Sequence, residues 1–466
     1  MSSHTALPLL AARPEACVAW RAGVPVSGAQ FVADASRLAE QLPAHGQPIN
    51  LCGDRYLFAV GLAAALLRGQ TSLMPPNSLP DTLARLRGAY PALYALCDDA
   101  ALDVGALERV LVDRKPAPLP ASTVVPQIAA DQVAVCLLTS GSTGLPQPHA
   151  KRWGPLVANI GAEAERLAIF IGRPTLAGLN VVATVPPQHS YGFESSVLLA
   201  LLGGASFDNS AAFFPADIVM ALERLPRPRA LVTTPFHLKT LLLAGIELPP
   251  IDLLLSATAP LSPQLAAQAE AAFGAPLVEI YGCTEAGQVA SRRTTAGDTW
   301  QTLGELTLRR EVDANAGNDA AERFIVHGGH VVEPTPLADI LQLESPTHFR
   351  LFGRANDLIH VAGKRSSLAH LNYHLNRIEG VHDGAFWLPE DAPDAVHRPI
   401  AFVVAPGLTA AQIAKALRGQ IESVFVPRRV VFVDALPREA TGKLTAQTLR
   451  RFALEQLARR GEAGAL

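Results

Sequence analysis

The 466-residue sequence contains few cysteines, and none of them form a pattern typical of a metal site. The five are Cys17, Cys52, Cys97, Cys136 and Cys283, and no CxxC pair occurs. An odd number of widely separated cysteines argues against a disulfide framework. We therefore expect reduced thiols in a cytoplasmic protein.

Long apolar runs and a strong net charge are also missing. The longest apolar run, residues 57–67, is too short to span a bilayer. The N-terminus has no charged segment followed by an apolar core, so we expect neither secretion nor a membrane span. The formal net charge of −3 implies no general attraction to nucleic acid. With 49% hydrophobic and 6% aromatic residues, the composition suits a soluble enzyme with a large interior.

The length predicts two or more domains. Up to about residue 350, short apolar strands alternate with helical segments, which predicts α/β layers. The expected strands are 133–138, 181–185, 230–233, 251–255 and 277–281. One helix should begin after Ser262, an N-cap residue followed by proline, and end at Gly274. Residues 312–318 have the composition of an exposed turn.

The pattern of expected strands and helices changes after Gly353-Arg354. We expect strands at 358–361, 400–404 and 430–433, an apolar stretch at 384–388, and helices at 410–423 and 446–460. About 110 residues of this kind can form a small α+β domain. The predicted fold class is therefore a large N-terminal multi-sheet α/β domain, residues 1–354, and a small C-terminal α+β domain, residues 355–466.

One polar loop follows the apolar strand at 133–138 and precedes a helical pattern at Leu156, Ile160, Ala164 and Leu167. It consists of Thr139, Ser140, Gly141, Ser142, Thr143 and Gly144. Backbone N–H groups and hydroxyls in such a loop can hold phosphate, and glycine permits a close approach. The loop lacks the Gly-Lys-Ser/Thr ending of a P-loop and the GxGxxG spacing of a dinucleotide fold. Taken alone, it fits a polar turn equally well.

Three other short segments carry groups suited to nucleotide chemistry. The stretch Tyr281-Gly282-Cys283-Thr284-Glu285 follows a strand, so Thr284 can donate to a phosphate and Glu285 can hold Mg²⁺. Asp339 can accept hydrogen bonds from ribose hydroxyls, and Arg354 adds a charged donor. Lys443, after Gly442, can stabilise charge on phosphate and carboxylate oxygens. Each segment alone also fits an ordinary solvated turn.

The order and spacing of these segments resemble the successive core motifs of the adenylate-forming ligases, a superfamily that includes acyl- and aryl-CoA synthetases. The resemblance runs from about residue 50 to 450. It implies that a carboxylate attacks the α-phosphate of MgATP to give an acyl-adenylate, and that a thiol then displaces AMP. The implied cofactors are ATP, Mg²⁺, and CoA or a carrier protein's phosphopantetheine as thiol acceptor. The small domain would move between the two steps.

The resemblance also implies a role for each matching residue. The loop Thr139 to Gly144 would hold the outer phosphates, Thr284 the α-phosphate and Glu285 the metal. Asp339 and Arg354 would hold the ribose, and Lys443 the reacting oxygens. The adenine would lie between two parts of the chain. One is Tyr281 with its neighbour Gly282, and the other is the segment Ser256, Ala257, Thr258, Ala259 and Pro260. The loop around Gly363 would line the thiol tunnel in a second pose.

The chain departs from the family pattern in three places. Gln147 stands where a lysine commonly follows the phosphate loop, and we consider Lys151 as its substitute. The hinge residue, usually charged, is Asn356. Ala257 and Thr258 stand where the adenine segment usually has two glycines. These departures leave open an alternative, a catalytically degenerate homologue that binds nucleotide or acyl groups.

The substrate is indicated by residues 186–192, which resemble the family pattern Pro-x-x-His-x-x-Gly and place His189 beside the acyl pocket. Amino-acid-activating members have aspartate at the next position, where this chain has Ser190. A buried ammonium without a partner is costly, so we expect an aryl or acyl acid rather than an α-amino acid.

The acceptor is left open. Residues 143–153 resemble ligases found with bacterial aryl-polyene pigment pathways, which points to an acidic carrier protein, a separate chain, as a possible partner. A basic face of the C-terminal part would suit an acidic carrier protein or the phosphates of CoA. The same residues also fit an ordinary solvated helix face. The basic face comprises Lys415, Arg418, Arg428, Arg429, Arg450, Arg451, Arg459 and Arg460.

Overall fold

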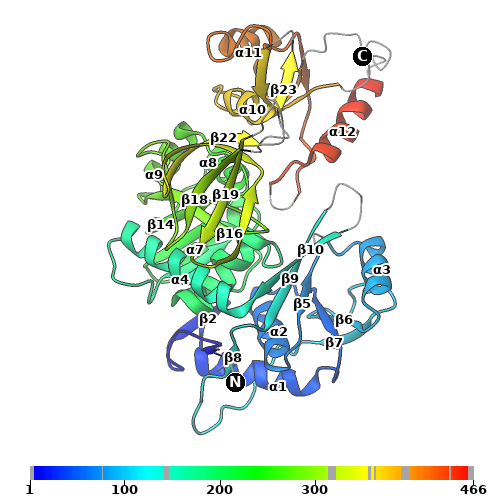
Figure 1. The fold of residues 1–466 in the computed structure, drawn as a ribbon, viewed down its shortest axis with the longest axis vertical. Helices are drawn as coiled ribbons and strands as arrows, with labels where there is room; N and C mark the ends of the chain where they lie inside the picture. The colour runs from blue at the N-terminus through cyan, green and yellow to red at the C-terminus, as the bar shows by residue number, and fades with distance from the viewer. Residues whose placement is uncertain are drawn as a thin grey trace.

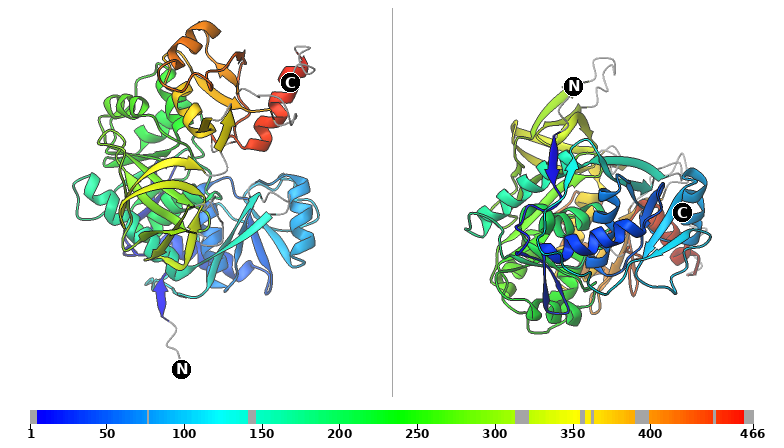
Figure 2. Two further views of the ribbon diagram at one scale, coloured as in Figure 1. Left: turned by 45° about the horizontal axis from the view of Figure 1, so that its top comes forward. Right: turned by 90° about the horizontal axis from the view of Figure 1, so that it is seen from below.

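The computed structural model describes residues 5–75, 77–140, 146–312, 322–354, 358–361, 364–389, 399–439 and 442–459. Figure 1 shows a large N-terminal part, blue to yellow, below a smaller C-terminal part in orange and red. The left view of Figure 2 places the small part at the end of the molecule away from the N-terminus. This arrangement confirms the predicted fold class.

A six-stranded sheet carries the predicted phosphate loop at its edge. Its order is β10-β9-β5-β4-β6-β7, parallel except for the antiparallel pair β9–β10. The strands are β4 (Gln47–Asn50), β5 (Ser72–Met74), β6 (Leu93–Cys97), β7 (Glu108–Leu111), β9 (Val133–Ser140) and β10 (Pro146–Arg152). Two prolines in β10 are tolerated because this strand lies at the sheet edge.

An eleven-stranded sheet forms the centre of the large domain, in the order β21-β22-β17-β16-β15-β14-β13-β11-β12-β2-β3. Its strands from β15 to β2 are parallel, and the flanking strands are antiparallel. The strands are β2 (Cys17–Arg21), β3 (Val24–Ser27), β11 (Asn180–Ala183), β12 (Ser206–Asp208), β13 (Arg229–Thr233), β14 (Leu253–Ser256), β15 (Leu277–Cys283), β16 (Gly287–Arg292), β17 (Trp300–Thr302), β21 (Asp339–Ser345) and β22 (His348–Arg354).

Two small antiparallel sheets and nine α-helices complete the described part of the large domain. The sheets pair β1 (Ala6–Pro8) with β8 (Gln127–Ala129), and β18 (Thr307–Val312), β19 (Glu322–Gly328) and β20 (Val331–Leu337) in that order. The helices are α1 (Gly28–Gln41), α2 (Arg55–Leu67), α3 (Pro80–Ala89), α4 (Trp153–Phe170), α5 (Ser190–Gly192), α6 (Leu199–Gly203), α7 (Pro215–Arg224), α8 (Pro235–Leu243) and α9 (Pro263–Phe273), with the π-helical segment η1 (Phe193–Leu198) between α5 and α6.

The long apolar run of the sequence becomes α2, which is buried on all sides. Its side chains share one hydrophobic core with those of α1, β9, β11 and β13, so this helix fills the space between the two large sheets. Within the described ranges, every helix is too short or too polar to cross a lipid bilayer. All five cysteines are free thiols, as predicted.

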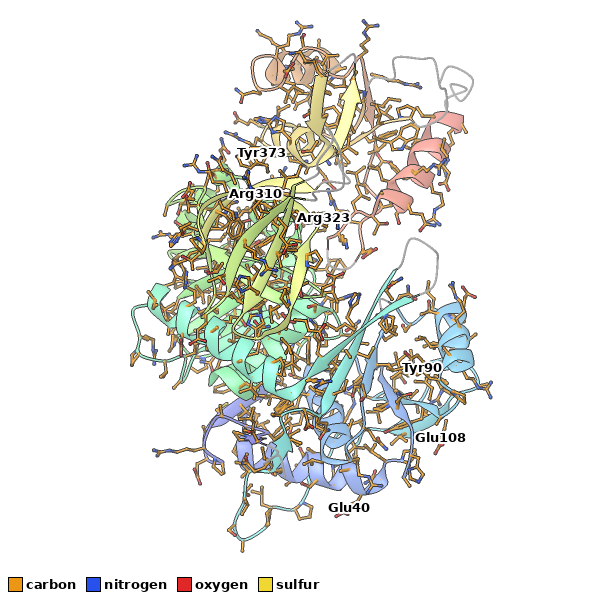
Figure 3. All side chains as sticks on the ribbon, in the orientation of Figure 1. Glu40, Tyr90, Glu108, Arg310, Arg323 and Tyr373 are labelled. Atoms are coloured by element: carbon orange, nitrogen blue, oxygen red, sulfur yellow. The ribbon has the colours of Figure 1, made fainter. Side chains whose placement is uncertain are left out.

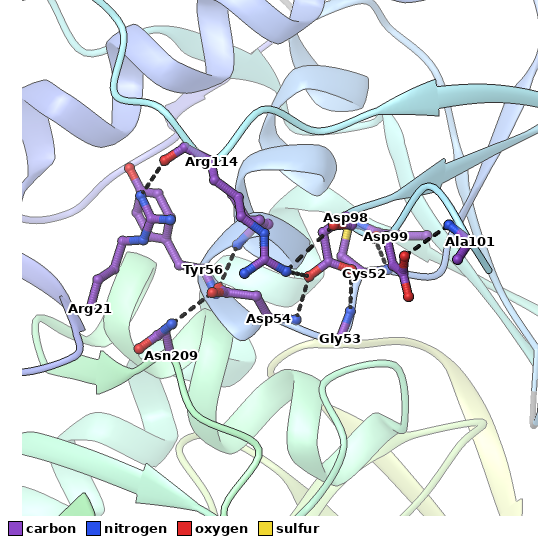
Figure 4. A network of polar contacts seen from close by, with 12 residues as sticks. Arg21, Cys52, Gly53, Asp54, Tyr56, Asp98, Asp99, Ala101, Arg114 and Asn209 are labelled. Atoms are coloured by element: carbon purple, nitrogen blue, oxygen red, sulfur yellow. Dashed lines mark hydrogen bonds and ion pairs between the residues drawn. The ribbon is translucent and has the colours of Figure 1, made fainter.

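A polar network also joins the two large sheets (Figure 4). Asp98, after β6, accepts hydrogen bonds from the backbone N–H groups of Gly53 and Asp54 at 3.0 and 2.9 Å. Asp54 caps α2 and accepts a hydrogen bond from Asn209, which follows β12, at 2.6 Å. The two sheets are thereby held in one relative position at the ends of their strands.

The small domain packs helices on a mixed three-stranded sheet, in the order β25-β26-β27, with a separate hairpin β23–β24. The elements are β23 (Leu358–Val361), β24 (Lys364–Ser367), α10 (Leu368–Asn376), β25 (Asp383–Trp387), β26 (Ile400–Val404), α11 (Ala410–Leu417), β27 (Arg429–Phe432) and α12 (Ala446–Arg459). Figure 3 shows Tyr373 of α10 above Arg310 and Arg323 of β18 and β19, on the two sides of the domain junction. Two hydrophobic clusters formed by residues 359–457 give this domain its own core.

The structure confirms the predicted elements and corrects two of them. The helix after Ser262 has the predicted cap, because Ser262 Oγ accepts from Leu265 N and Gly274 is left-handed. The polar loop, however, joins two strands rather than a strand and a helix, since β10 returns along β9 before α4 begins. The helix predicted at 410–423 ends at Leu417, and Gly419 adopts a φ of 87°. The predicted turn at 312–318 lies beyond the described residues, except for Val312 in β18.

Candidate active site

The turn that carries Thr284 and Glu285 follows β15 directly. β15 and β16 form a hairpin in which Cys283 pairs with Gly287 and Gly282 pairs with Gln288. The turn lifts Thr284 into a half-buried position and Glu285 into an exposed one. A hydroxyl donor and a carboxylate are therefore displayed side by side at the carboxyl end of a central strand, where α/β folds commonly bind ligands.

One face of β10 directs nitrogen-bearing side chains to this turn. Side chains alternate along a strand, so Gln147, His149 and Lys151 share a face. His149 Nε2 lies 3.9 Å from Glu285 Oε1, and Lys151 Nζ donates to the Glu285 carbonyl oxygen at 2.8 Å. Burial lowers the pKa of Lys151, while nearby Glu194 and Glu285 oppose that shift. The sequence prediction that Lys151 replaces the missing cation at Gln147 stays a prediction.

His189 lies on a tight turn that a glycine makes possible. A Cβ on Gly192 would lie 2.1 Å from the Pro186 carbonyl oxygen, so only glycine fits there. Phe193 N donates to the His189 carbonyl at 2.7 Å, which starts the helical segments α5 and η1. A π-helical segment of this kind is often found at functional sites.

Arg55, at the start of α2, supports the same turn. This buried guanidinium donates to the carbonyls of Ala183 and Val185 at 3.0 and 2.9 Å, and to Ser196 Oγ at 2.8 Å. It thus fixes the end of β11 against the start of η1. Burial lowers the pKa of Arg55 to about 10, so it remains charged at neutral pH. Arg55 carries no signal in the sequence, because its partners, two carbonyls and a serine hydroxyl, lie far away in the chain.

The small domain brings Lys443 to His189. Burial is the main cause of the lowered pKa of His189, and the positive charge of Lys443 lowers it further. Gly442 makes this approach possible: its φ is +76°, and a Cβ there would lie 2.9 Å from Phe236 Cβ. Lys443 and His189 come from different domains, yet they lie close enough for the charge of the lysine to affect the pKa of the histidine.

A charged pair holds the Lys443 loop in shape. Arg438 donates from Nε and Nη2 to the two carboxylate oxygens of Asp383 at 2.7 and 2.6 Å, and from Nη1 to the Gly442 carbonyl at 2.9 Å. Its guanidinium carbon also lies 5.8 Å from the Phe236 ring centre, across the domain junction. Because such a two-point contact fixes orientation as well as distance, Arg438 sets the direction of the loop.

Tyr281 and Asp339, which the resemblance assigns to the adenine and the ribose, are in direct contact. Tyr281 Oη donates to Asp339 Oδ2 at 2.7 Å, and Asp339 pairs with Arg354 across β21 and β22. Tyr281 also packs against Trp300 and Phe349, with ring centres 5.7 Å away in both cases. The side chain of Arg354 is outside the described part of the structure.

The segment predicted to flank adenine follows β14. Ser256 ends that strand fully buried, Ala257 is buried, and Thr258 is exposed with a φ of +77°. Ala259 and Pro260 continue the loop toward Ser262. A positive φ is unfavourable for a β-branched residue, so this backbone has the conformation for which the family's glycine is suited.

Part of the predicted site lies outside the described residues. The backbones of Thr139 and Ser140 end β9, but Gly141, Ser142, Thr143 and Gly144 are not described, nor are Asn356 and Gly363. Where the structure describes the chain, no three His, Cys, Asp or Glu side chains gather to hold a metal ion. Mg²⁺ typically uses one or two carboxylates plus substrate phosphates, and the exposed Glu285 carboxylate fits that requirement.

The comparisons with known proteins agree with this geometry. A sequence model described as AMP-binding enzyme matches residues 13–310, and one described as AMP-binding enzyme C-terminal domain matches residues 388–443. A 4-coumarate–CoA ligase of Rhodobacter capsulatus is 30% identical over 309 residues, which cover 66% of this chain and 73% of that protein. A 2,3-dihydroxybenzoate-AMP ligase of Bacillus subtilis is 23% identical, with 72% and 66% covered.

Solved structures share the fold along almost the whole chain. An anthranilate CoA ligase in complex with anthranoyl-AMP has a TM-score of 0.77 at 17% identity, covering 99% of both chains. The O-succinylbenzoate coenzyme A synthetase of Bacillus subtilis, in complex with ATP and magnesium ion, has a TM-score of 0.77 at 18% identity, with 96% of this chain and 100% of that chain covered. At these identities the likeness concerns the fold.

Proposed function

Because the chain belongs to the AMP-binding enzyme family, we propose that it is an AMP-forming ligase that joins an aryl or acyl carboxylic acid, not an α-amino acid, to a thiol. The observation that carries the proposal is the close seating of Gly442 against Phe236, which brings the charge of Lys443 within range of His189 in the domain that also holds Thr284 and Glu285. The matched relatives are ligases, so they give no support to a degenerate, non-catalytic homologue.

The first half-reaction joins two anions, so the site must offset their repulsion. A carboxylate oxygen of the acid attacks the α-phosphorus of ATP, and the bond to pyrophosphate breaks. Lys443 supplies positive charge to the reacting oxygens, and Thr284 donates a hydrogen bond to the α-phosphate. The substrate itself is the nucleophile. His189 lies beside the acid and is neutral because its pKa is lowered, so it forms no ion pair with the carboxylate.

We assign the nucleotide to the elements around this centre. Asp339, oriented by Tyr281, accepts from the ribose hydroxyls together with Arg354 as donor. The turn at 256–260 flanks the adenine, and the β9–β10 loop from Thr139 to Gly144 holds the outer phosphates. Glu285 holds Mg²⁺, which neutralises phosphate charge when bound. Gly363 lines the path of the thiol in the second half-reaction, in which sulfur attacks the acyl carbon and AMP leaves.

The acceptor is CoA or the phosphopantetheine of a carrier protein. A groove of about 450 Å³ on the small domain, beside α11, offers Arg418 and Arg428 to phosphates or acidic side chains.

We place the domain boundary between residues 354 and 355, where β22 ends. We place the protein in the cytoplasm, where its free thiols stay reduced.

Isotope exchange between pyrophosphate and ATP tests the first half-reaction directly. We expect exchange with members of a panel of benzoic, cinnamic and fatty acids, and none with α-amino acids. Exchange with no acid in the panel would contradict the proposal. Supplying CoA and a phosphopantetheinylated carrier protein side by side then identifies the acceptor by thioester formation.

A further inference from the structure

One lysine of the large domain is covered by the small domain at the domain junction. Lys239 lies on α8 one turn after Phe236, so the two side chains share one side of the helix. Phe236 itself meets Gly442 and the guanidinium group of Arg438. Lys239 is half-buried, and its Nζ donates to the carbonyl oxygen of Asn376, the last residue of α10, at 3.4 Å. The hydrogen bond of this ammonium group is therefore made to the domain that is proposed to move.

The charge of Lys239 is only partly compensated in this position. An ammonium group has three N–H donors, and within the described residues Lys239 has one acceptor, the Asn376 carbonyl. Asp383 attracts the ammonium group, but both of its carboxylate oxygens already accept from Arg438, at 2.7 and 2.6 Å. The positive charge of Arg438 acts against Lys239. A half-buried charge with such partners is less stable than the same charge in water.

We infer that Lys239 limits the stability of the domain orientation in the structure, and that it thereby promotes departure of the small domain once the adenylate has formed. The inference rests on the proposed function, in which the small domain moves between the two half-reactions. The small domain covers the ammonium group in this orientation and returns it to water when it leaves. A protein that uses two orientations in every turnover needs a small free-energy difference between them. Lys239 is thus a positioning residue, which acts through the small domain and not on the reacting atoms.

The pKa of Lys239 gives the sign of this effect. Burial lowers the pKa to about 8; the charge of Asp383 opposes that shift, and the charge of Arg438 adds to it. Among the described residues, no charged group of the neighbouring helices α9 and α10 contributes to the shift in this pKa.

The lowered pKa links the domain orientation to pH. In water the lysine has its ordinary pKa of 10.5, so departure of the small domain is accompanied by proton uptake between pH 8 and 10.5. Below pH 8 the lysine is charged in both orientations, and the full cost of its burial opposes the orientation in the structure. Raising the pH from 7 to 9 should therefore stabilise this orientation, because the covered lysine becomes neutral.

Three variants, with the two half-reactions measured separately, test the inference. Lys239→Met removes the charge, so the orientation in the structure should become more stable. We expect its pyrophosphate exchange to equal or exceed that of the wild type, and its thioester formation from a supplied acyl-adenylate to be about 10-fold slower. Lys239→Arg keeps the charge and should stay within about twofold of the wild type in both half-reactions. Lys115→Met, which alters an exposed lysine after β7, is the control for a lost charge and should change neither.

The pH profile is a readout that a purely structural role of Lys239 would not move. The quantity compared is the rate of thioester formation divided by the rate of pyrophosphate exchange. Dividing this ratio by the same ratio in Lys239→Arg removes the ionisation of the acceptor thiol. We expect the result to fall about 3- to 10-fold between pH 7 and 9, because only the wild-type residue loses its charge.

An NMR titration of the lysine ¹³Cε signals provides a readout that does not depend on activity. The sequence contains six lysines, so the signal that is lost in Lys239→Arg identifies Lys239. We expect this signal to titrate with a pKa near 8, and titration at the ordinary value of 10.5 would overturn the inference. Identical pH profiles of the wild type and Lys239→Arg would overturn it as well.

The variant without the charge separates the inference from its opposite and from the function. Slower pyrophosphate exchange in Lys239→Met with unchanged thioester formation would show that the lysine clamps the small domain in place. That result would overturn the inference while leaving the proposed ligase function intact, and so would unchanged rates in both half-reactions. Absence of exchange with every acid would instead contradict the function.

Discussion

Some residues of this site have backbone conformations that are unfavourable for the residue itself and that the surrounding structure imposes. Thr258 is the clearest case, because its φ of +77° lies in the left-handed region, which β-branched side chains avoid. It follows Ala257, whose φ is not positive, at the end of a buried central strand. The strain is therefore local to one residue of the turn proposed to flank adenine.

Replacing Thr258 by glycine should relieve this strain. We expect Thr258→Gly to raise the free energy of unfolding by about 1 kcal/mol, since the left-handed conformation is no longer penalised. Ala257→Gly is the matched control: it adds flexibility without relieving strain, so it should destabilise the protein by up to about 1 kcal/mol. Urea unfolding followed by circular dichroism measures both. A destabilised Thr258→Gly would mean that contacts of the threonine side chain outweigh the backbone strain.

Elements are held at the site by close contacts between their ends. The turn from Pro186 to Gly192 connects β11 to α5 and η1, and Arg55 of α2 fixes both sides of it. β10 meets the β15–β16 turn through Lys151 and Glu285. The site thus depends on the packing of turns more than on the length of any helix or strand.

A methyl group added at Gly192 should displace the His189 turn. The new Cβ would lie 2.1 Å from the Pro186 carbonyl oxygen, which is backbone and cannot rotate away. We expect Gly192→Ala to lower the free energy of unfolding by about 1–3 kcal/mol and to reduce pyrophosphate exchange at least about 10-fold. Gly161→Ala in α4 is the control, because no atom lies within 4 Å of its added Cβ, and it should be neutral or stabilising. Similar behaviour of the two variants would contradict the importance of the close contact.

At the scale of the whole molecule, two domains assemble one site. The small domain delivers Lys443, and its loop is braced by Arg438, Asp383 and the contact of Gly442 with Phe236. A second contact across the junction is the hydrogen bond of Lys239 Nζ to the Asn376 carbonyl, at 3.4 Å. This orientation brings the charge of Lys443 within range of His189, as the role proposed for this lysine in adenylate formation requires.

Removing the lysine should separate the two half-reactions. We expect Lys443→Ala to slow adenylate formation by about 10²- to 10³-fold, while thioester formation from a supplied acyl-adenylate stays nearly unchanged. The pKa of His189 should rise toward its ordinary value, because a nearby positive charge is lost; an NMR titration measures that shift. Lys115→Ala, in the exposed segment after β7, is the control for a lost charge. Equal loss in both half-reactions would contradict the role proposed for Lys443.

The sequence by itself determined the family, the fold class and the residues that the family motifs name. Those motifs are short and contiguous, so a strand, its turn and the displayed side chain can be predicted together, as for Thr284 and Glu285. Loop connectivity was less certain, and the strand β10 was missed because its prolines and basic residues do not alternate with apolar ones.

Only the tertiary structure decided which polar groups are buried together. Asn159 and Glu163 interrupt the apolar face of α4 one turn apart, and this was the available signal, but their neighbours Glu194, Gln288 and His330 come from distant elements. Burial and hydrogen-bond geometry arise when the elements pack, so they cannot be predicted from spacing along the chain. The residues proposed to carry the chemistry thus lie in local motifs, while the packing that surrounds them exists only in the folded molecule.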